Sequence, residues 1–275
     1  MWRNILTGVA AVAICAGVSA QQTHTVKSKD NVNVQYLGTY SFADSAWSGS
    51  SRVGTRVLYN CTSNGNYYSN VGNSWTTAAD QLWIDEGILA DTNGAFVDQV
   101  NGFDFAYCST DLTPVGNATI RIAFYDDYTP CTTPPAATCT YDVTGLPLST
   151  TGNTVCYGVG VDLEGGFECS TDLNDMFNTF SGAIAGTGEF GWAFGANPGL
   201  TGMNNTGPIL DLPCPTPVAL NGCRSGNSNL FWWDDPTGLN SGCYWFGRIP
   251  WTRFSMKMYG GGPNAFAYGH ATNPP

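Results

Sequence analysis

Hydrophobic and polar residues alternate along several segments of the chain. In residues 119–125, for example, the side chains of Ile120 and Phe124 fall on the same side of an extended strand. A period of two sustained over six or more residues is typical of a strand with one buried face. The same alternation occurs at 155–163 and 254–259, and shorter runs predict strands at 52–59, 81–85, 100–107, 190–194, 230–233 and 244–246.

Turn residues separate these segments and indicate a single all-β domain. Asn-Gly steps, which readily adopt the positive φ angles of tight turns, lie at 64–65, 93–94, 101–102 and 221–222. A short helix is predicted only at 173–180. Residues 196–223 are rich in Pro, Gly and Asn, and we expect them to form one long loop. The predicted fold is an antiparallel, jelly-roll-like β-sandwich formed by residues 21–275, with long Gly-, Pro- and Asn-rich loops.

Residues 1–20 have the features of a secretory signal peptide. A positively charged start precedes an apolar stretch from Ile5 to Val18, and small residues lead to Ala20. Signal peptidase requires such small residues, so we expect cleavage after Ala20. The apolar stretch is shorter than the ~20 residues that span a bilayer. We therefore expect residues 21–275 to be secreted, without insertion into a membrane.

The chain has ten cysteines, of which nine remain once Cys15 leaves with the signal peptide. In an oxidising compartment they are expected to pair. Eight cysteines allow many connectivities, so the pairing stays open, and one thiol is left over. Proximity along the sequence favours Cys131 with Cys139, Cys156 with Cys169, Cys61 with Cys108, and one pair among Cys214, Cys223 and Cys243.

The charge balance narrows the range of partners. Acidic residues outnumber basic ones by 21 to 10, which gives a net charge of −11. Nucleic acids and anionic membrane surfaces attract basic proteins. We therefore expect no nucleic-acid partner, and consider a polysaccharide or another extracellular protein instead.

Short aromatic blocks give the chain a resemblance to a known type of secreted protein. The blocks are 102–107 (Gly-Phe-Asp-Phe-Ala-Tyr), 122–127 (Ile-Ala-Phe-Tyr-Asp-Asp), 231–234 (Phe-Trp-Trp-Asp), 243–247 (Cys-Tyr-Trp-Phe-Gly) and 256–260 (Met-Lys-Met-Tyr-Gly). With them, most of the chain after the signal peptide resembles uncharacterised secreted β-rich proteins of planctomycete-type bacteria. The resemblance implies a jelly-roll-like sandwich and export, but no activity and no catalytic residue.

Nucleophilic triads are disfavoured because they need a histidine between two partners. After removal of the signal peptide only His24 and His270 remain, near opposite ends of the chain. The motifs Gly-x-Ser-x-Gly and His-Glu-x-x-His are absent from the sequence. Hydrolysis by these routes is therefore not expected.

Pairs of carboxylates remain as the catalytic option. Asp162, Glu164 and Glu168 follow one another at the end of a predicted strand, and Glu189 is a further candidate. Two carboxyl groups at a suitable separation perform glycoside hydrolysis. We favour the alternative interpretation, in which residues 162–168 form a solvated acidic turn.

Adjacent acids suggest one candidate cofactor, a structural calcium ion. The pairs Asp126–Asp127 and Asp234–Asp235 supply the oxygen ligands that Ca²⁺ prefers, although no EF-hand pattern is present. The alternative is that each pair ends a strand and caps a turn through its own backbone.

Aromatic residues make up 13% of the chain and occur in adjacent pairs such as Trp232–Trp233 and Tyr244–Trp245. Neighbouring residues of a strand point to opposite faces, so one ring of each pair is expected to point outward. Exposed rings beside amides and carboxylates form platforms on which sugars stack. The alternative is a second buried aromatic cluster.

The sequence thus favours a secreted β-sandwich with a structural, surface or interaction role and no catalysis. A carbohydrate-binding module that uses exposed aromatic rings is the first alternative. A glycoside hydrolase with a carboxylate pair is the second.

Overall fold

The structure of the chain is a computed structural model. It describes residues 21–22, 27–28, 32–49, 56–62, 67–69, 71, 80–88, 98–112, 118–125, 128–171, 189–196, 205–210, 230–246 and 252–260. The regular structure of these residues is β-strand, which confirms the predicted all-β class. Within the same ranges no helix is long and apolar enough to cross a membrane. The predicted helix at 173–180 and the predicted signal peptide 1–20 lie outside the described residues.

The first sheet has seven strands, and its neighbours are antiparallel except for one parallel pair at the edge, β1 with β16. From one edge to the other its order is β1 (Gln21–Gln22), β16 (Gly242–Trp245), β15 (Phe231–Asp234), β7 (Leu82–Ile88), β13 (Glu189–Ala196), β9 (Ala118–Tyr125) and β10 (Cys139–Leu146).

The second sheet has ten strands and is organised around the long strand β8 (Asp98–Ser109). Strand β8 is antiparallel to all four of its neighbours, while β11 and β3 form a parallel pair. The remaining strands of this second sheet are β2 (Lys27–Ser28), β3 (Val34–Ser41), β4 (Ala46–Ser48), β5 (Arg56–Cys61), β6 (Tyr67–Tyr68), β11 (Val155–Asp162), β12 (Cys169–Thr171), β14 (Thr206–Leu210) and β17 (Met256–Gly260).

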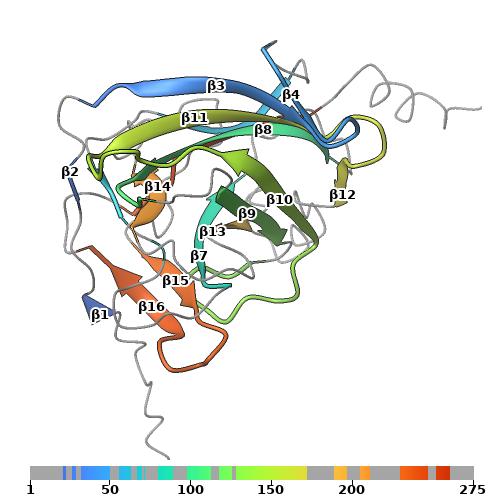
Figure 1. Ribbon diagram of the computed structural model, residues 1–275. Helices are drawn as coiled ribbons and strands as arrows, with labels where there is room; N and C mark the ends of the chain where they lie inside the picture. Colours follow the sequence, from blue (N-terminus) through green and yellow to red (C-terminus); the bar gives the residue numbers. More distant parts are fainter. Residues whose placement is uncertain are drawn as a thin grey trace, which may run out of the picture.

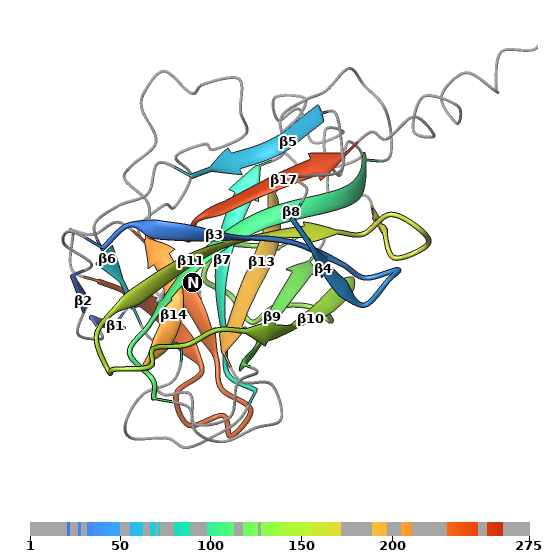
Figure 2. The same ribbon diagram turned by 45° about the horizontal axis from the view of Figure 1, so that its top comes forward.

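The two sheets pack face to face as an unclosed β-sandwich, as predicted (Figure 1). In Figure 2 the strands β17, β8 and β11 of the second sheet run across β7 and β13 of the first. Aromatic rings of the two sheets pack against each other. The ring centroids of Phe103 (β8) and Phe124 (β9) lie 5.4 Å apart, and those of Phe105 (β8) and Phe194 (β13) lie 6.2 Å apart. Burial of such rings supplies most of the hydrophobic stabilisation of the core.

The alternation predicted for β9 is confirmed on its inner face, where Ile120, Ile122 and Phe124 are fully buried. The opposite face is also covered near the end of the strand. There Tyr125 packs in a second cluster with Tyr128, next to the partly buried Trp232. Strand β9 is therefore buried on both sides at one end, which period-two alternation alone does not predict.

One predicted loop contains a strand. Residues 196–223 include β14, whose five residues are all buried and which pairs with β8 and β6. Its sequence, Thr-Gly-Pro-Ile-Leu, does not alternate because both faces are enclosed. Pro208 in this strand has no N–H to donate to a neighbour, which is why the sequence favours a loop here.

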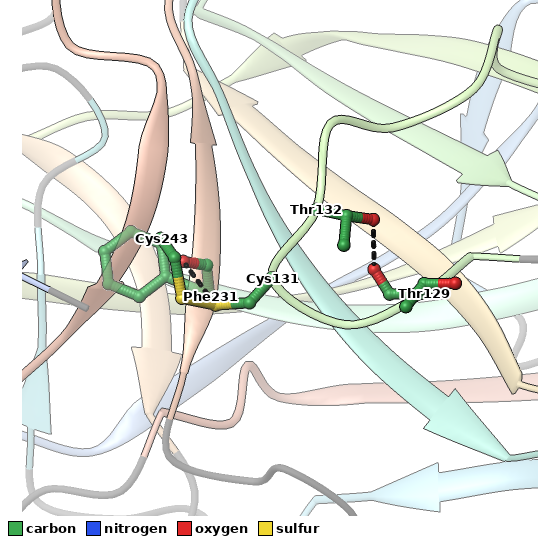
Figure 3. The surroundings of a disulfide bond; sticks show 5 residues. All are labelled: Thr129, Cys131, Thr132, Phe231 and Cys243. Carbon is green, nitrogen blue, oxygen red and sulfur yellow. Dashed lines mark hydrogen bonds between the residues drawn. A yellow bond between two sulfur atoms is a disulfide. The ribbon is translucent and has the colours of Figure 1, made fainter. Parts of the chain in front are cut away.

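The six cysteines of the three definite predicted pairs are all disulfide-bonded, but these three pairs are wrong. Of the group in which one further pair was expected, Cys243 is bonded to Cys131, while Cys214 and Cys223 lie outside the described residues. The bonds are Cys108–Cys156, Cys131–Cys243 and Cys139–Cys169, and Cys61 is disulfide-bonded as well, though not to Cys108. The physical reason is strand pairing: Cys108 of β8 lies directly opposite Cys156 of β11 in the sheet register. Sheet register therefore sets this pair, and the packing of the sheets and the loop after β9 brings the other two pairs together, whatever their distance along the sequence. Figure 3 shows Cys131 bonded to Cys243 beside Phe231.

Candidate functional site

The acidic candidates Asp162, Glu164 and Glu168 gather at one turn, between β11 and β12. Glu168 accepts two hydrogen bonds, from the backbone N–H of Gly165 (3.2 Å) and from that of Gly166 (3.0 Å). Both glycines have positive φ angles, +95° and +103°, which favour glycine over residues with a side chain. The carboxylate of Glu168 therefore caps the backbone of a tight turn.

Asp162 and Glu164 differ from Glu168 in their surroundings. Asp162 Oδ1 accepts the backbone N–H of Glu164 at 2.8 Å. Partial burial raises the pKa of Asp162, and the negative charges of Asp44 and Glu168 raise it further, while the Glu164 N–H lowers it. The pKa of exposed Glu164 is raised by desolvation and by the charges of Asp162 and Glu168. Of the three carboxylates, those of Asp162 and Glu168 accept backbone N–H groups of this turn, whereas that of Glu164 does not.

The fourth carboxylate candidate lies in a different part of the sandwich. Glu189 begins β13 of the first sheet, where its backbone is opposite Ile88 of β7. The acidic turn follows β11 of the second sheet. The sequence alone does not show that these candidates belong to different sheets.

Of the four aromatic residues predicted to bind ligand, two lie in the core. Trp233 is 2% exposed and Tyr244 is 8% exposed, and their ring centroids lie 5.5 Å apart. Both are therefore unavailable to a ligand at the surface. Trp232 and Trp245 alternate with them and are half-buried, as strand geometry requires.

Of the calcium candidates, Asp234 is the last residue of β15 and Asp235 follows it, where it caps the turn between β15 and β16. Its carboxylate accepts hydrogen bonds from the backbone and side chain of Thr237 and from both nitrogens of Asn240. Burial acts to raise the pKa of Asp235, but these hydrogen bonds outweigh it and lower the pKa. The turn-capping interpretation therefore describes this pair, while Asp126 and Asp127 lie outside the described residues.

Metal ligands do not converge within the described ranges. No group of three or more His, Cys, Asp or Glu side chains that could hold a metal ion occurs there.

A buried acid ties the first sheet to the segment that precedes β17. Asp85 of β7 is 1% exposed, and its carboxylate accepts the backbone N–H of Phe254 and that of Glu86, each at 2.9 Å. Burial raises its pKa from 3.8 to about 7, although the Phe254 N–H and the positive charge of Arg253 act in the opposite direction. Because the carboxylate is enclosed, its role is in the fold and not in binding a substrate.

The outer surface of the second sheet carries a polar group that sequence reasoning missed. On β8 and β17 the core residues Phe103 and Met256 alternate with Asp104 and Lys257, which are therefore directed outward. The register places Asp104 opposite both Gly160 of β11 and Lys257 of β17. We call the side chains of Tyr36, Thr39, Asp104, Lys257 and Tyr259 the Tyr36 face.

Within the Tyr36 face one contact lies in β3, one lies in β17, and one joins β17 to β8. Tyr36 is 51% exposed and shares a hydrogen bond of 3.1 Å with Thr39. Tyr259 donates to the Asp104 carboxylate, and Lys257 Nζ lies 5.0 Å from the centre of the Tyr259 ring. Gly160 of β11 leaves room for the Tyr36 hydroxyl group, because a Cβ at Gly160 would lie 2.7 Å from the hydroxyl oxygen. The face thus combines one exposed ring, Tyr36, with the half-buried Asp104 and Lys257, while Thr39 and Tyr259 are buried beneath it.

Comparison with known proteins adds no relative: no family model, no curated protein and no solved structure matches the chain.

Proposed function

We propose that the protein is exported and acts without catalysis, in a structural or interaction role outside the cell. The observation that carries the proposal is the use of the Glu168 carboxylate as a backbone cap. A nucleophile or general base must be free to reach its substrate, and in this turn Glu168 is held by two backbone N–H groups. Three disulfides support export, since such bonds persist in oxidising compartments.

Export has a direct chemical test. The protein is isolated from the medium of its own cells, and its N-terminal residue is determined. We expect the chain to begin at Gln21, because the signal peptide is predicted to end at Ala20. A chain found only inside the cells with residues 1–20 intact contradicts export.

The absence of catalysis is tested with a panel of soluble and insoluble polysaccharides. Reducing ends released by the wild type are compared with those released by Glu164→Gln, which removes the most exposed carboxylate of the acidic turn. We expect both proteins to match a blank without protein. Release by the wild type that Glu164→Gln abolishes would replace this proposal with a glycoside hydrolase.

The Tyr36 face favours carbohydrate binding as a second candidate function. A half-exposed tyrosine ring whose hydroxyl group lies, like the half-buried Asp104 carboxylate, next to Gly160 has the chemistry on which sugar rings stack and form hydrogen bonds. The ring is Tyr36, and not one of the tryptophan or tyrosine residues predicted from the sequence.

Carbohydrate binding is tested by retention on the same polysaccharides. Tyr36→Ala is expected to lose retention shown by the wild type, because it removes the exposed ring. Phe167→Ala is the matched control, since Phe167 is 44% exposed but lies in the acidic turn. Trp233→Ala is unsuitable, because it creates a cavity in the core. Equal retention of Tyr36→Ala and wild type contradicts this second candidate.

A further inference from the structure

The loop between β9 and β10 has an unusual composition. From residue 128 to residue 138 it reads Tyr-Thr-Pro-Cys-Thr-Thr-Pro-Pro-Ala-Ala-Thr, without a charged side chain. Threonine precedes proline at two places, Thr129–Pro130 and Thr133–Pro134. Segments rich in Thr and Pro are typical sites of O-glycosylation, because they remain extended and do not form a packed core.

The structure shows that the threonines of this loop are accessible. Thr129, Thr132 and Thr133 are all exposed, and residues 129–138 belong to no strand. Together with prolines and small residues they line an open crevice of about 480 Å³. An enzyme that modifies a hydroxyl group needs such a surface segment, which can enter its active site without breaking a sheet.

Two disulfides fix the loop to the sandwich. Cys131 is bonded to Cys243 of β16, and Cys139, which begins β10, is bonded to Cys169 of β12. Between these anchors Pro134 and Pro135 fix the φ angle of the backbone, and a residue that precedes proline is restricted to extended conformations. Thr133 is therefore presented on an extended, anchored segment.

The hydroxyl groups of the loop are not equivalent. Thr132 Oγ1 donates a hydrogen bond of 2.6 Å to the backbone oxygen of Thr129, as Figure 3 shows. The Thr132 backbone N–H donates to the same oxygen at 3.3 Å. Thr132 is thus directed back into the loop, whereas Thr129 and Thr133 occupy the two positions before proline.

We propose that Thr129 and Thr133 are acceptors for O-linked sugars. In each transfer, Thr Oγ1 forms a bond to the anomeric carbon of a phosphate-activated sugar, and the bond between that carbon and the phosphate oxygen breaks. The hydroxyl proton passes to a base of the transferase, and the phosphate group leaves with the electron pair. The donor is a nucleotide- or lipid-linked sugar, and the enzyme is a glycosyltransferase of the export route. This inference goes beyond the proposed function and shares only export with it.

The test uses full-length, affinity-tagged protein purified from its own cells and their medium. Peptides that contain residues 129–138 are analysed by mass spectrometry with fragmentation that preserves sugar linkages. We expect hexose or N-acetylhexosamine additions on Thr129 and Thr133. The double variant Thr129→Ala/Thr133→Ala is expected to lose these additions, whereas the matched variant Thr132→Ala retains them.

Three results would overturn the inference. They are an unmodified loop in wild-type protein recovered from the medium, a phosphate in place of a sugar, or equal modification of Thr144, an exposed strand threonine that does not precede proline. An unmodified loop in secreted protein contradicts glycosylation and leaves the proposed non-catalytic role standing. Reducing-sugar release dependent on Glu164 contradicts that role and leaves the glycosylation inference standing.

Discussion

Individual carboxylates in this protein serve mainly to satisfy backbone N–H groups, and their surroundings set opposite pKa shifts. Asp85 is enclosed in the sandwich, and burial raises its pKa to about 7. Asp235 accepts four hydrogen bonds in a surface turn, which outweigh its burial and lower its pKa. Desolvation disfavours the charged form, and hydrogen bonds to the charged form favour it. The two aspartates therefore make contributions of opposite sign to the pH dependence of stability.

The raised pKa of Asp85 predicts a specific pH dependence of stability. Between about pH 4 and pH 7 the folded protein holds a proton on Asp85 that the unfolded chain has released. The free energy of unfolding therefore falls as pH rises through this window, by up to about 1.4 kcal/mol per pH unit for one group. Urea unfolding of wild type and of Asp85→Asn at several pH values measures this pH dependence of the free energy of unfolding.

The comparison isolates Asp85 because the other acids titrate in both proteins. Asp85 is acted on by the backbone N–H groups of Phe254 and Glu86 and by the charge of Arg253, and the variant leaves these residues in place. The charge of Asp85 in turn raises the pKa of Tyr128, which the variant also retains. We expect the decline between pH 4 and pH 7 to be smaller in Asp85→Asn. An identical slope in the two proteins would show that Asp85 titrates near its ordinary pKa.

At the scale of elements, the absence of a side chain at Gly87 makes room for a contact between the two sheets. Gly87 of β7 is buried between the rings of Phe190 of β13 and Tyr59 of β5, and a Cβ there would lie 2.7–2.8 Å from their carbon atoms. These two rings meet edge to face at 5.3 Å. Gly87 thus permits an aromatic contact between a strand of the first sheet and a strand of the second.

Replacement of Gly87 by alanine is expected to destabilise the protein. The new methyl group must displace two packed rings, and overpacking of this kind costs about 1–3 kcal/mol. Gly49→Ala is the matched control, because no atom lies within 4 Å of its added Cβ. Chemical denaturation measures both variants, and equal stability of Gly87→Ala and wild type would contradict the packing described.

The sequence predicted those elements whose signal is local. Alternation located β9, β11 and β17, but it failed for β3, where Gly38 has a φ angle of +112° and the pairing of β3 with β11 shifts register. A bulge of this kind interrupts the period of two. Strand β14 was missed because both of its faces are buried. Each failure thus arises from contacts with strands distant in the sequence.

For the candidate sites too, local features could be predicted from the sequence, and contacts between distant strands could not. Acidic residues close in sequence were correctly expected to share a turn, because Asp162, Glu164 and Glu168 span only seven positions. The capping role of Glu168 depends on the turn geometry and was not predicted. The Tyr36 face was missed altogether, since its residues share one face of the sheet only through the pairing of four strands, β3, β11, β8 and β17.

For the molecule as a whole, two of the disulfides, Cys139–Cys169 and Cys131–Cys243, connect parts that the strand pairing leaves separate. Cys139–Cys169 joins β10 of the first sheet to β12 of the second, whereas Cys108–Cys156 lies within the second sheet. Cys131–Cys243 attaches the loop after β9 to β16, near the opposite side of the first sheet. The chain is thereby cross-linked both within and between its layers.

The lengths of chain enclosed by these bonds predict their order of importance. Cys131 and Cys243 are 112 residues apart, and Cys139 and Cys169 are 30 residues apart. In the chain-entropy description, closing the longer loop stabilises by about 4.8 kcal/mol and closing the shorter one by about 3.6 kcal/mol. The variant Cys131→Ala/Cys243→Ala is therefore expected to lose about 1 kcal/mol more than Cys139→Ala/Cys169→Ala. Thermal and urea unfolding of both, beside wild type with and without dithiothreitol, measure the difference. If Cys139→Ala/Cys169→Ala is the less stable variant, the connection between the two sheets matters more than loop length.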